Sequence, residues 1–208
     1  MGTTLLPRPV SALQLMRRAL SFSVCGLTVA VLISCGSANN FLTPASFENV
    51  DRQFSLYALT GTSSSLPAAY QFTTESIVRP QVLNNGSLNF DVALDLDASG
   101  KVTVMTAKKI VPLPPAGAPT VGLLKLTAVY DQLAIAPDKG YVNDSTVTLA
   151  IGEAVLVRLT GSGCIYGEPI YAKFAIDSID TVARRILVRS LVNRNCGYRS
   201  LKAGVPAS

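Results

Sequence analysis

The 208-residue sequence contains no histidine and no tryptophan, and only 15% of its residues are charged. Without histidine, the chain cannot form Ser-His or Cys-His nucleophile pairs or histidine-ligated metal sites. The Ser-x-x-Lys motif of serine–lysine acyl enzymes is also absent. No glycine-rich segment ends in Gly-Lys-Ser/Thr, as a phosphate-binding loop does. The sequence therefore predicts a protein that is not an enzyme and has no cofactor.

Acidic residues are missing from positions 1–34, which contain three arginines. The whole chain has a formal net charge of +5, but the residues from 35 onward have 15 basic and 13 acidic side chains, a net charge of +2. A nearly neutral domain has no broad positive field to attract a polyanion. We therefore expect no nucleic-acid partner.

An apolar segment, "ALSFSVCGLTVAVLIS", follows the two arginines at 17–18. A charged start followed by about 15 mostly apolar residues is typical of a secretory signal, whereas a transmembrane helix needs about 20. The segment leads into "LISC" at 32–35, which resembles the lipobox of bacterial lipoproteins. Met16 is an alternative start to Met1, because "MRRALSFSV" opens an ordinary signal.

This resemblance implies that Cys35 carries a thioether-linked diacylglycerol, that residues 1–34 are cleaved off, and that the new amine is acylated. Two or more acyl chains hold a protein stably in a membrane. Gly36, rather than aspartate, follows Cys35, and in Gram-negative lipoproteins this implies the outer membrane. The resemblance thus implies an exported, membrane-anchored protein; an uncleaved membrane anchor and a disulfide cysteine are the alternative interpretations of Cys35.

Cys164 and Cys196 are the only cysteines that follow Cys35. Two cysteines in an exported domain favour a disulfide, here closing a loop of about 30 residues. A metal site is the alternative, but two isolated cysteines without histidine are poor zinc ligands. We therefore predict a Cys164–Cys196 disulfide.

Short strand-like segments separated by turns fill the rest of the chain. Residues 88–97 alternate with period two, "NNGS" at 84–87 predicts a hairpin turn, and the proline-rich 112–119 cannot join a central strand. Residues 181–193 fit both helical and strand spacing, and we favour a strand. We predict an all-β antiparallel meander of about 8–10 strands in a closed or nearly closed, lipocalin-like barrel, with a two-sheet sandwich as the alternative.

The chain is accordingly divided into four segments. They are a cleaved signal peptide at 1–34, a lipidated flexible tether at 35–52, a single β domain at 53–201 and a disordered tail at 202–208. The small and polar residues of the second segment and the "KAGVPAS" ending of the last one indicate loops.

Three groups of charged residues are candidate sites. In "DLDASGK", the oxygens of Asp95, Asp97 and Ser99 match positions 1, 3 and 5 of a calcium loop, but Thr106 stands where that loop needs glutamate, so a hairpin turn is favoured. A hydrolase could use the aspartates at 91, 95 and 97, or those at 177 and 180, because alternate strand residues lie about 6–7 Å apart. The favoured interpretation is a solvated strand face, because acidic alternation on an exposed strand usually serves solubility and no tryptophan is present to stack on a sugar.

Basic residues gather near the carboxyl end at Arg184, Arg185, Arg189, Arg194 and Arg199. They fit the solvent-exposed face of one strand, or a contact with anionic lipid head groups or surface polysaccharide.

Taken together, the sequence predicts a lipid-anchored envelope protein with a non-enzymatic β module for binding or structure, whose partner is an envelope protein, a polysaccharide or a small apolar ligand. A carrier of a small apolar ligand in a lipocalin-like barrel and an aspartate-dependent hydrolase are the alternatives.

Overall fold

The computed structural model describes residues 42–206; the predicted signal peptide, Cys35 and the start of the predicted tether lie outside this range. The elements are β1 (Asp51–Tyr57), β2 (Ala69–Gln71), β3 (Ser76–Val78), β4 (Val92–Leu96), β5 (Val102–Thr106), α2 (Ala107–Ile110), β6 (Thr120–Lys125), η1 (Tyr130–Gln132), β7 (Val142–Asn143), β8 (Thr146–Leu149), β9 (Ala154–Thr160), β10 (Ile170–Asp180) and β11 (Arg185–Asn193). The all-β class is confirmed, and the ambiguous segment at 181–193 contains strand β11.

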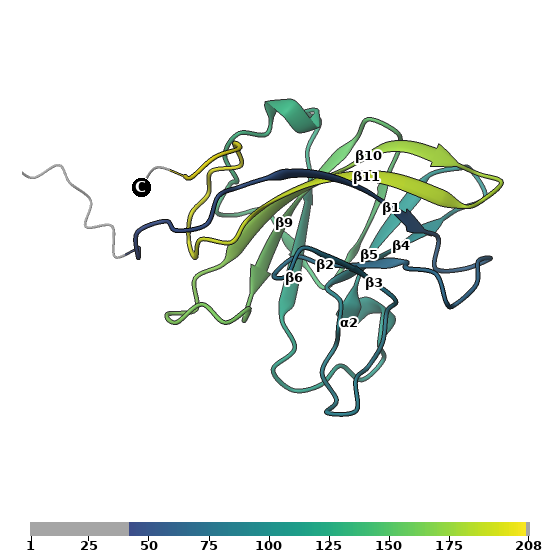
Figure 1. The fold of residues 1–208 in the computed structure, drawn as a ribbon, viewed down its shortest axis with the longest axis horizontal. Coiled ribbons are helices and arrows are strands. Elements are labelled where there is room, and N and C mark those ends of the chain that lie inside the picture. Colours follow the sequence, from purple (N-terminus) through teal and green to yellow (C-terminus); the bar gives the residue numbers. More distant parts are fainter. Residues whose placement is uncertain (1–41, 207–208) are drawn as a thin grey trace, which may run out of the picture. The chain divides into compact units, whose positions relative to one another are not determined.

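Two antiparallel sheets form a sandwich-like domain (Figure 1). The larger sheet has the order β1-β11-β10-β9-β6-β7, and the smaller has the order β3-β2-β4-β5-β8. The predicted closed or nearly closed barrel is wrong, and the alternative of two sheets fits: in the part of the chain that the structure describes, no strand pairing joins the sheets. The chain crosses between them through segments such as 112–119, whose prolines have no N–H to extend a ladder.

Apolar side chains fill the space between the sheets. Phe174 on β10 is fully buried, and its ring centroid lies 6.2–6.5 Å from those of Phe54, Tyr70 and Phe72. A lipocalin-like carrier would hold its ligand in such an interior space. These aromatic rings occupy that space, so the packing gives the carrier alternative no support.

Each sheet also buries part of its outer face. The segment that follows β6 and includes η1 packs Tyr130 and Leu133 onto the larger sheet. Ala107 and Ile110 of α2 pack near Ala93 of the smaller sheet. Polar residues on these outer faces can therefore be buried even though their strands alternate in polarity.

The chain segments before β1 and after β11 contact each other. The backbone N–H groups of Asn49 and Gly204 each donate to the other residue's carbonyl at 3.0 Å. The Asn49 amide donates to the carbonyls of Ser200 and Lys202, both at 3.1 Å. Parts of the predicted tether and tail thus lie together at one end of the sandwich, on the left in Figure 1.

Among residues 42–206, no helix is long and apolar enough to span a bilayer.

Candidate functional site

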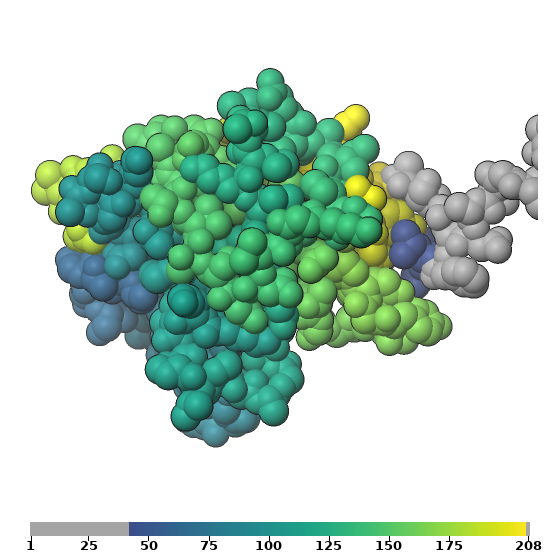
Figure 2. All heavy atoms as spheres, turned by 180° about the vertical axis from the view of Figure 1, so that it is seen from behind, coloured from purple at the N-terminus to yellow at the C-terminus, as the bar shows by residue number. Residues whose placement is uncertain are grey.

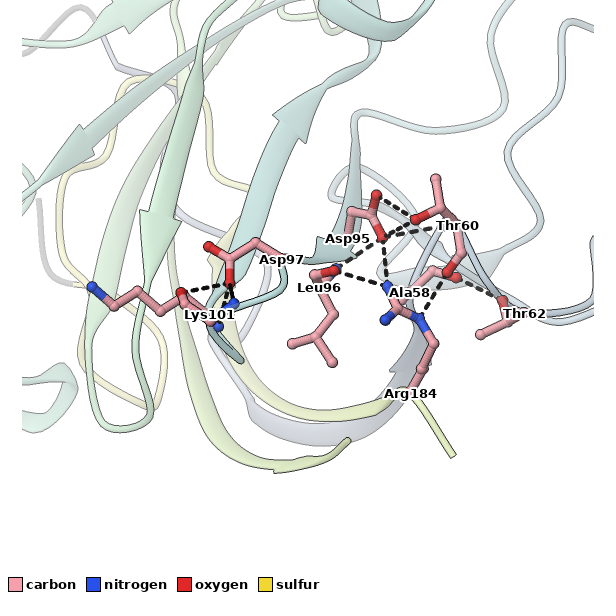
Figure 3. Close-up of polar contacts among 9 residues, drawn as sticks. Ala58, Thr60, Thr62, Asp95, Leu96, Asp97, Lys101 and Arg184 are labelled. Atoms are coloured by element: carbon pink, nitrogen blue, oxygen red, sulfur yellow. Dashed lines mark hydrogen bonds and ion pairs between the residues drawn. The ribbon is translucent and has the colours of Figure 1, made fainter. Parts of the chain in front are cut away.

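Arg184 and Asp95 form the centre of a polar cluster that links the two sheets (Figure 3). Arg184 lies in the turn between β10 and β11 and has a φ of 50°. Its Nε donates to the Thr60 carbonyl at 2.9 Å, and its Nη2 donates to the Leu96 carbonyl at 2.8 Å. The Nη2 atom also lies 3.3 Å from Oδ1 of Asp95. The guanidinium is therefore engaged by three acceptors of the protein itself.

The carboxylate of Asp95 is held from a second direction by Thr60. The Thr60 hydroxyl lies 2.9 Å from both oxygens of Asp95, and the Thr60 N–H donates to Oδ1 at 3.2 Å. The Arg184 side chain also lies over Gly61, where a Cβ would come within 2.9 Å of the Arg184 Nε. The cluster therefore fixes the loop after β1 against β4 and the β10–β11 turn.

Arg184, Arg185 and Arg189, three of the five arginines predicted to contact an anionic surface, have different surroundings. Arg185 is exposed. Arg189 lies 3.2 Å from Asp131 and 3.4 Å from Asp177, and its guanidinium is 4.3 Å from the centroid of the Tyr130 ring. Since Arg184 and Arg189 are both paired with carboxylates, the geometry gives a shared anion-binding surface no support.

Arg184→Ala should lower the free energy of unfolding by about 2 kcal/mol, because it removes charge-assisted hydrogen bonds and leaves partly buried acceptors without a donor. The neighbouring Arg185→Ala is the matched control, since an exposed substitution of this kind changes stability by less than about 0.5 kcal/mol. Urea unfolding of the two variants measures the difference. Equal midpoints for both variants would contradict the structural role of Arg184.

The carboxylate of Asp97 stabilises the turn between β4 and β5. Its Oδ1 accepts hydrogen bonds from the Ser99 N–H at 2.8 Å, the Ser99 hydroxyl at 2.7 Å and the Lys101 N–H at 2.9 Å. The bond from the Ser99 side chain, followed by that from the Lys101 backbone, lowers the pKa of Asp97. Figure 3 shows the carboxylates of Asp95 and Asp97 pointing toward different partners. Within residues 42–206, no group of three or more His, Cys, Asp or Glu residues is placed to hold a metal ion.

Asp91 is buried, although strand alternation indicated a solvated face. It precedes β4 and is only 5% exposed. The Phe72 N–H donates to its Oδ2 at 2.7 Å. Burial raises the pKa of Asp91 from 3.8 to about 6, and the hydrogen bond from Phe72 opposes this rise only in part. Asp91 and Asp95 therefore do not form an exposed carboxylate pair that could act on a substrate.

The second pair of aspartates is also engaged by neighbouring groups. The Gln53 amide donates to Oδ2 of Asp177 at 2.8 Å. Oδ1 of Asp180 accepts hydrogen bonds from the backbone N–H groups of Val182 and Ala183 at 3.1 and 2.9 Å. These contacts stabilise the β10–β11 hairpin, and they give the hydrolase alternative no support.

Lys173 is a buried cation that the sequence pattern did not single out. Its Nζ donates to the carbonyls of Tyr130 and Leu133 at 3.2 and 3.3 Å, and lies 4.2 Å from the centroid of the Tyr130 ring. Burial lowers the pKa of Lys173. The ammonium group therefore ties the segment around η1 to the larger sheet, a contact that no local sequence signal indicates.

The predicted disulfide joins Cys164 to Cys196 and forms one wall of a pocket with a volume of about 260 Å³. Phe47, Ile165 and Tyr166 also line this pocket. Ile165 and Tyr166 are 88% and 79% exposed, and Phe47 is 46% exposed. Three large apolar side chains thus gather at the disulfide, at the end of the molecule where the described chain begins.

Comparisons of the chain with protein-family models, with curated proteins and with solved structures found no match.

Proposed function

We propose that this protein is a lipid-anchored protein of the cell envelope, held in a membrane through Cys35, in the outer membrane if the host is Gram-negative. The observation that carries the proposal is the lipobox-like "LISC" at 32–35, directly after an apolar segment with two preceding arginines. The Cys164–Cys196 disulfide supports it, because such bonds persist in oxidising compartments outside the cytosol.

The anchored part is a β module for binding or structure, without catalytic activity. The absence of histidine from the sequence supports this part of the proposal, as do the contacts of the aspartates. Asp91 is buried, and Asp95 and Asp97 are bonded to groups of the domain itself. Asp95 and Asp97 thus stabilise the fold, and the buried Asp91 does not face a substrate.

Metabolic labelling with an alkyne fatty acid tests the anchor. Cells that express the full-length chain should incorporate the label, and Cys35→Ala should lose it and accumulate the uncleaved precursor, because only the Cys35 thiol accepts the diacylglycerol. Cys25→Ala is the matched control, since it changes a cysteine inside the apolar segment and should keep the label. A wild-type chain that is exported without any label would contradict the proposal.

A further inference from the structure

The connection between β9 and β10 ends in a tight turn with an apolar tip. The Gly167 N–H donates to the Cys164 carbonyl at 3.1 Å and closes the turn, with Ile165 and Tyr166 as its two central residues. Turns of this kind usually present Gly, Pro, Asn, Asp or Ser. Here the tip exposes an isoleucine and a tyrosine, which are 88% and 79% accessible. Exposing this much apolar surface to water is unfavourable.

The disulfide and the start of the described chain position this tip. Cys164, the first residue of the turn, is bonded to Cys196 on the segment after β11. The Leu42 side chain packs closely against Gly197. A Cβ added at position 197 would lie 2.5 Å from Cδ2 of Leu42. Figures 1 and 2 show the β9–β10 loop at the same end of the molecule as the residues that follow position 41. The tip and the point where the chain enters the domain therefore lie at one end.

The length of the preceding chain limits how far this end can lie from a lipid at Cys35. Leu42 is seven residues after Cys35, and seven residues span at most about 25 Å. The opposite end, at the β10–β11 turn, carries the isolated Val182, which is 96% exposed. A bilayer that holds Cys35 is thus within reach of the Ile165–Tyr166 tip, and the β10–β11 turn lies at the far end of the domain.

We infer that Ile165 and Tyr166 contact the interfacial region of the phospholipid bilayer that holds the lipid on Cys35. The inference rests on the proposed lipid anchor. A tyrosine suits this location because its ring is apolar and its hydroxyl is polar, as in the aromatic belts of membrane proteins. The pocket beside the tip is lined by one charged side chain, Glu168, and by no lysine or arginine. The contact is therefore apolar and does not require anionic lipids.

A single tryptophan tests this contact, because the natural chain contains none. The full-length chain is expressed as Tyr166→Trp and, as the matched control, as Val182→Trp. The acylated mature form of each is reconstituted into phosphatidylcholine vesicles with brominated acyl chains. Both positions are exposed, so both variants should fold. We expect quenching by the brominated lipid and a blue-shifted emission for Y166W, and neither change for V182W.

The other outcomes separate the two proposals. If the vesicles carry both variants on flotation but neither is quenched, the anchor stands and the tip contact is overturned. Equal quenching of Y166W and V182W would also overturn it, because the domain would then have no preferred orientation. Protein without acyl mass that fails to float with vesicles would overturn both the anchor and the tip contact.

Discussion

Replacing Cys164 and Cys196 together by alanine should lower the free energy of unfolding by about 3–4 kcal/mol. The bond closes a loop with a sequence separation of 32 residues, and cross-linking a loop of this length removes a corresponding amount of entropy from the unfolded chain. For a domain of this size the loss corresponds to a decrease in Tm of about 10 °C. Alanine is preferred to serine because Cys164 packs against the main apolar cluster, where a hydroxyl would be poorly accommodated.

Calorimetry of the wild type and the double variant measures this loss, with and without a reducing agent. The reducing agent is the control, because it should lower the Tm of the wild type and leave that of the variant unchanged. A variant whose stability lies within about 1 kcal/mol of the wild type would show that the rest of the fold already holds these segments together. Since the same bond fixes the 164–167 turn, its loss should also increase the mobility of the apolar tip.

The free energy of unfolding of Asp91→Asn, measured relative to that of the wild type, should be higher at neutral pH than at pH 4. The folded-state pKa of Asp91 is about 6, above its usual 3.8, because the carboxyl group is buried. The fold therefore favours the protonated form. Its contribution to stability is complete below pH 3.8, falls as the pH rises, and is lost above about pH 6.

A shift from 3.8 to about 6 corresponds to about 3 kcal/mol between the two limits. Asparagine does not titrate, and it keeps an oxygen that can accept the hydrogen bond from the Phe72 N–H. The stability difference between D91N and the wild type should therefore rise by about 2.5 kcal/mol from pH 4 to pH 7, because pH 4 already lies slightly above the unfolded-state pKa of 3.8. Urea midpoints at several pH values across this interval measure the change.

Asp97→Asn is the control with the opposite sign. Hydrogen bonds lower the pKa of Asp97 in the fold, so its contribution is present at neutral pH and is lost as the solution is acidified. D97N should thus become less stable relative to the wild type as the pH rises. A stability difference between D91N and the wild type that does not change with pH would indicate that water reaches the Asp91 carboxyl group.

The charged residues illustrate what one-dimensional patterns cannot resolve. Strand alternation puts Asp91, Asp95 and Asp97 on one face, yet one is buried, one binds Arg184 and one stabilises a turn. Lys173 alternates with apolar residues on β10 and is also buried. For Asp91, Asp95 and Lys173 the deciding neighbour comes from a distant segment: 19 residues separate Asp91 from Phe72, 89 separate Asp95 from Arg184, and 43 separate Lys173 from Tyr130. Asp97 instead binds Ser99 and Lys101 within its own turn.

The sequence by itself determined the all-β class and the pairing of Cys164 with Cys196. It also favoured a strand within 181–193, where the structure has β11 at 185–193. These features depend on local alternation, on turn residues and on a cysteine count, all of which are present along the chain. The tertiary structure alone decided between two open sheets and a closed barrel. It also decided which face of each sheet is covered and that the apolar turn lies beside the start of the domain. Those properties depend on which strands pair over long distances, and local propensities are the same in a sandwich and in a barrel.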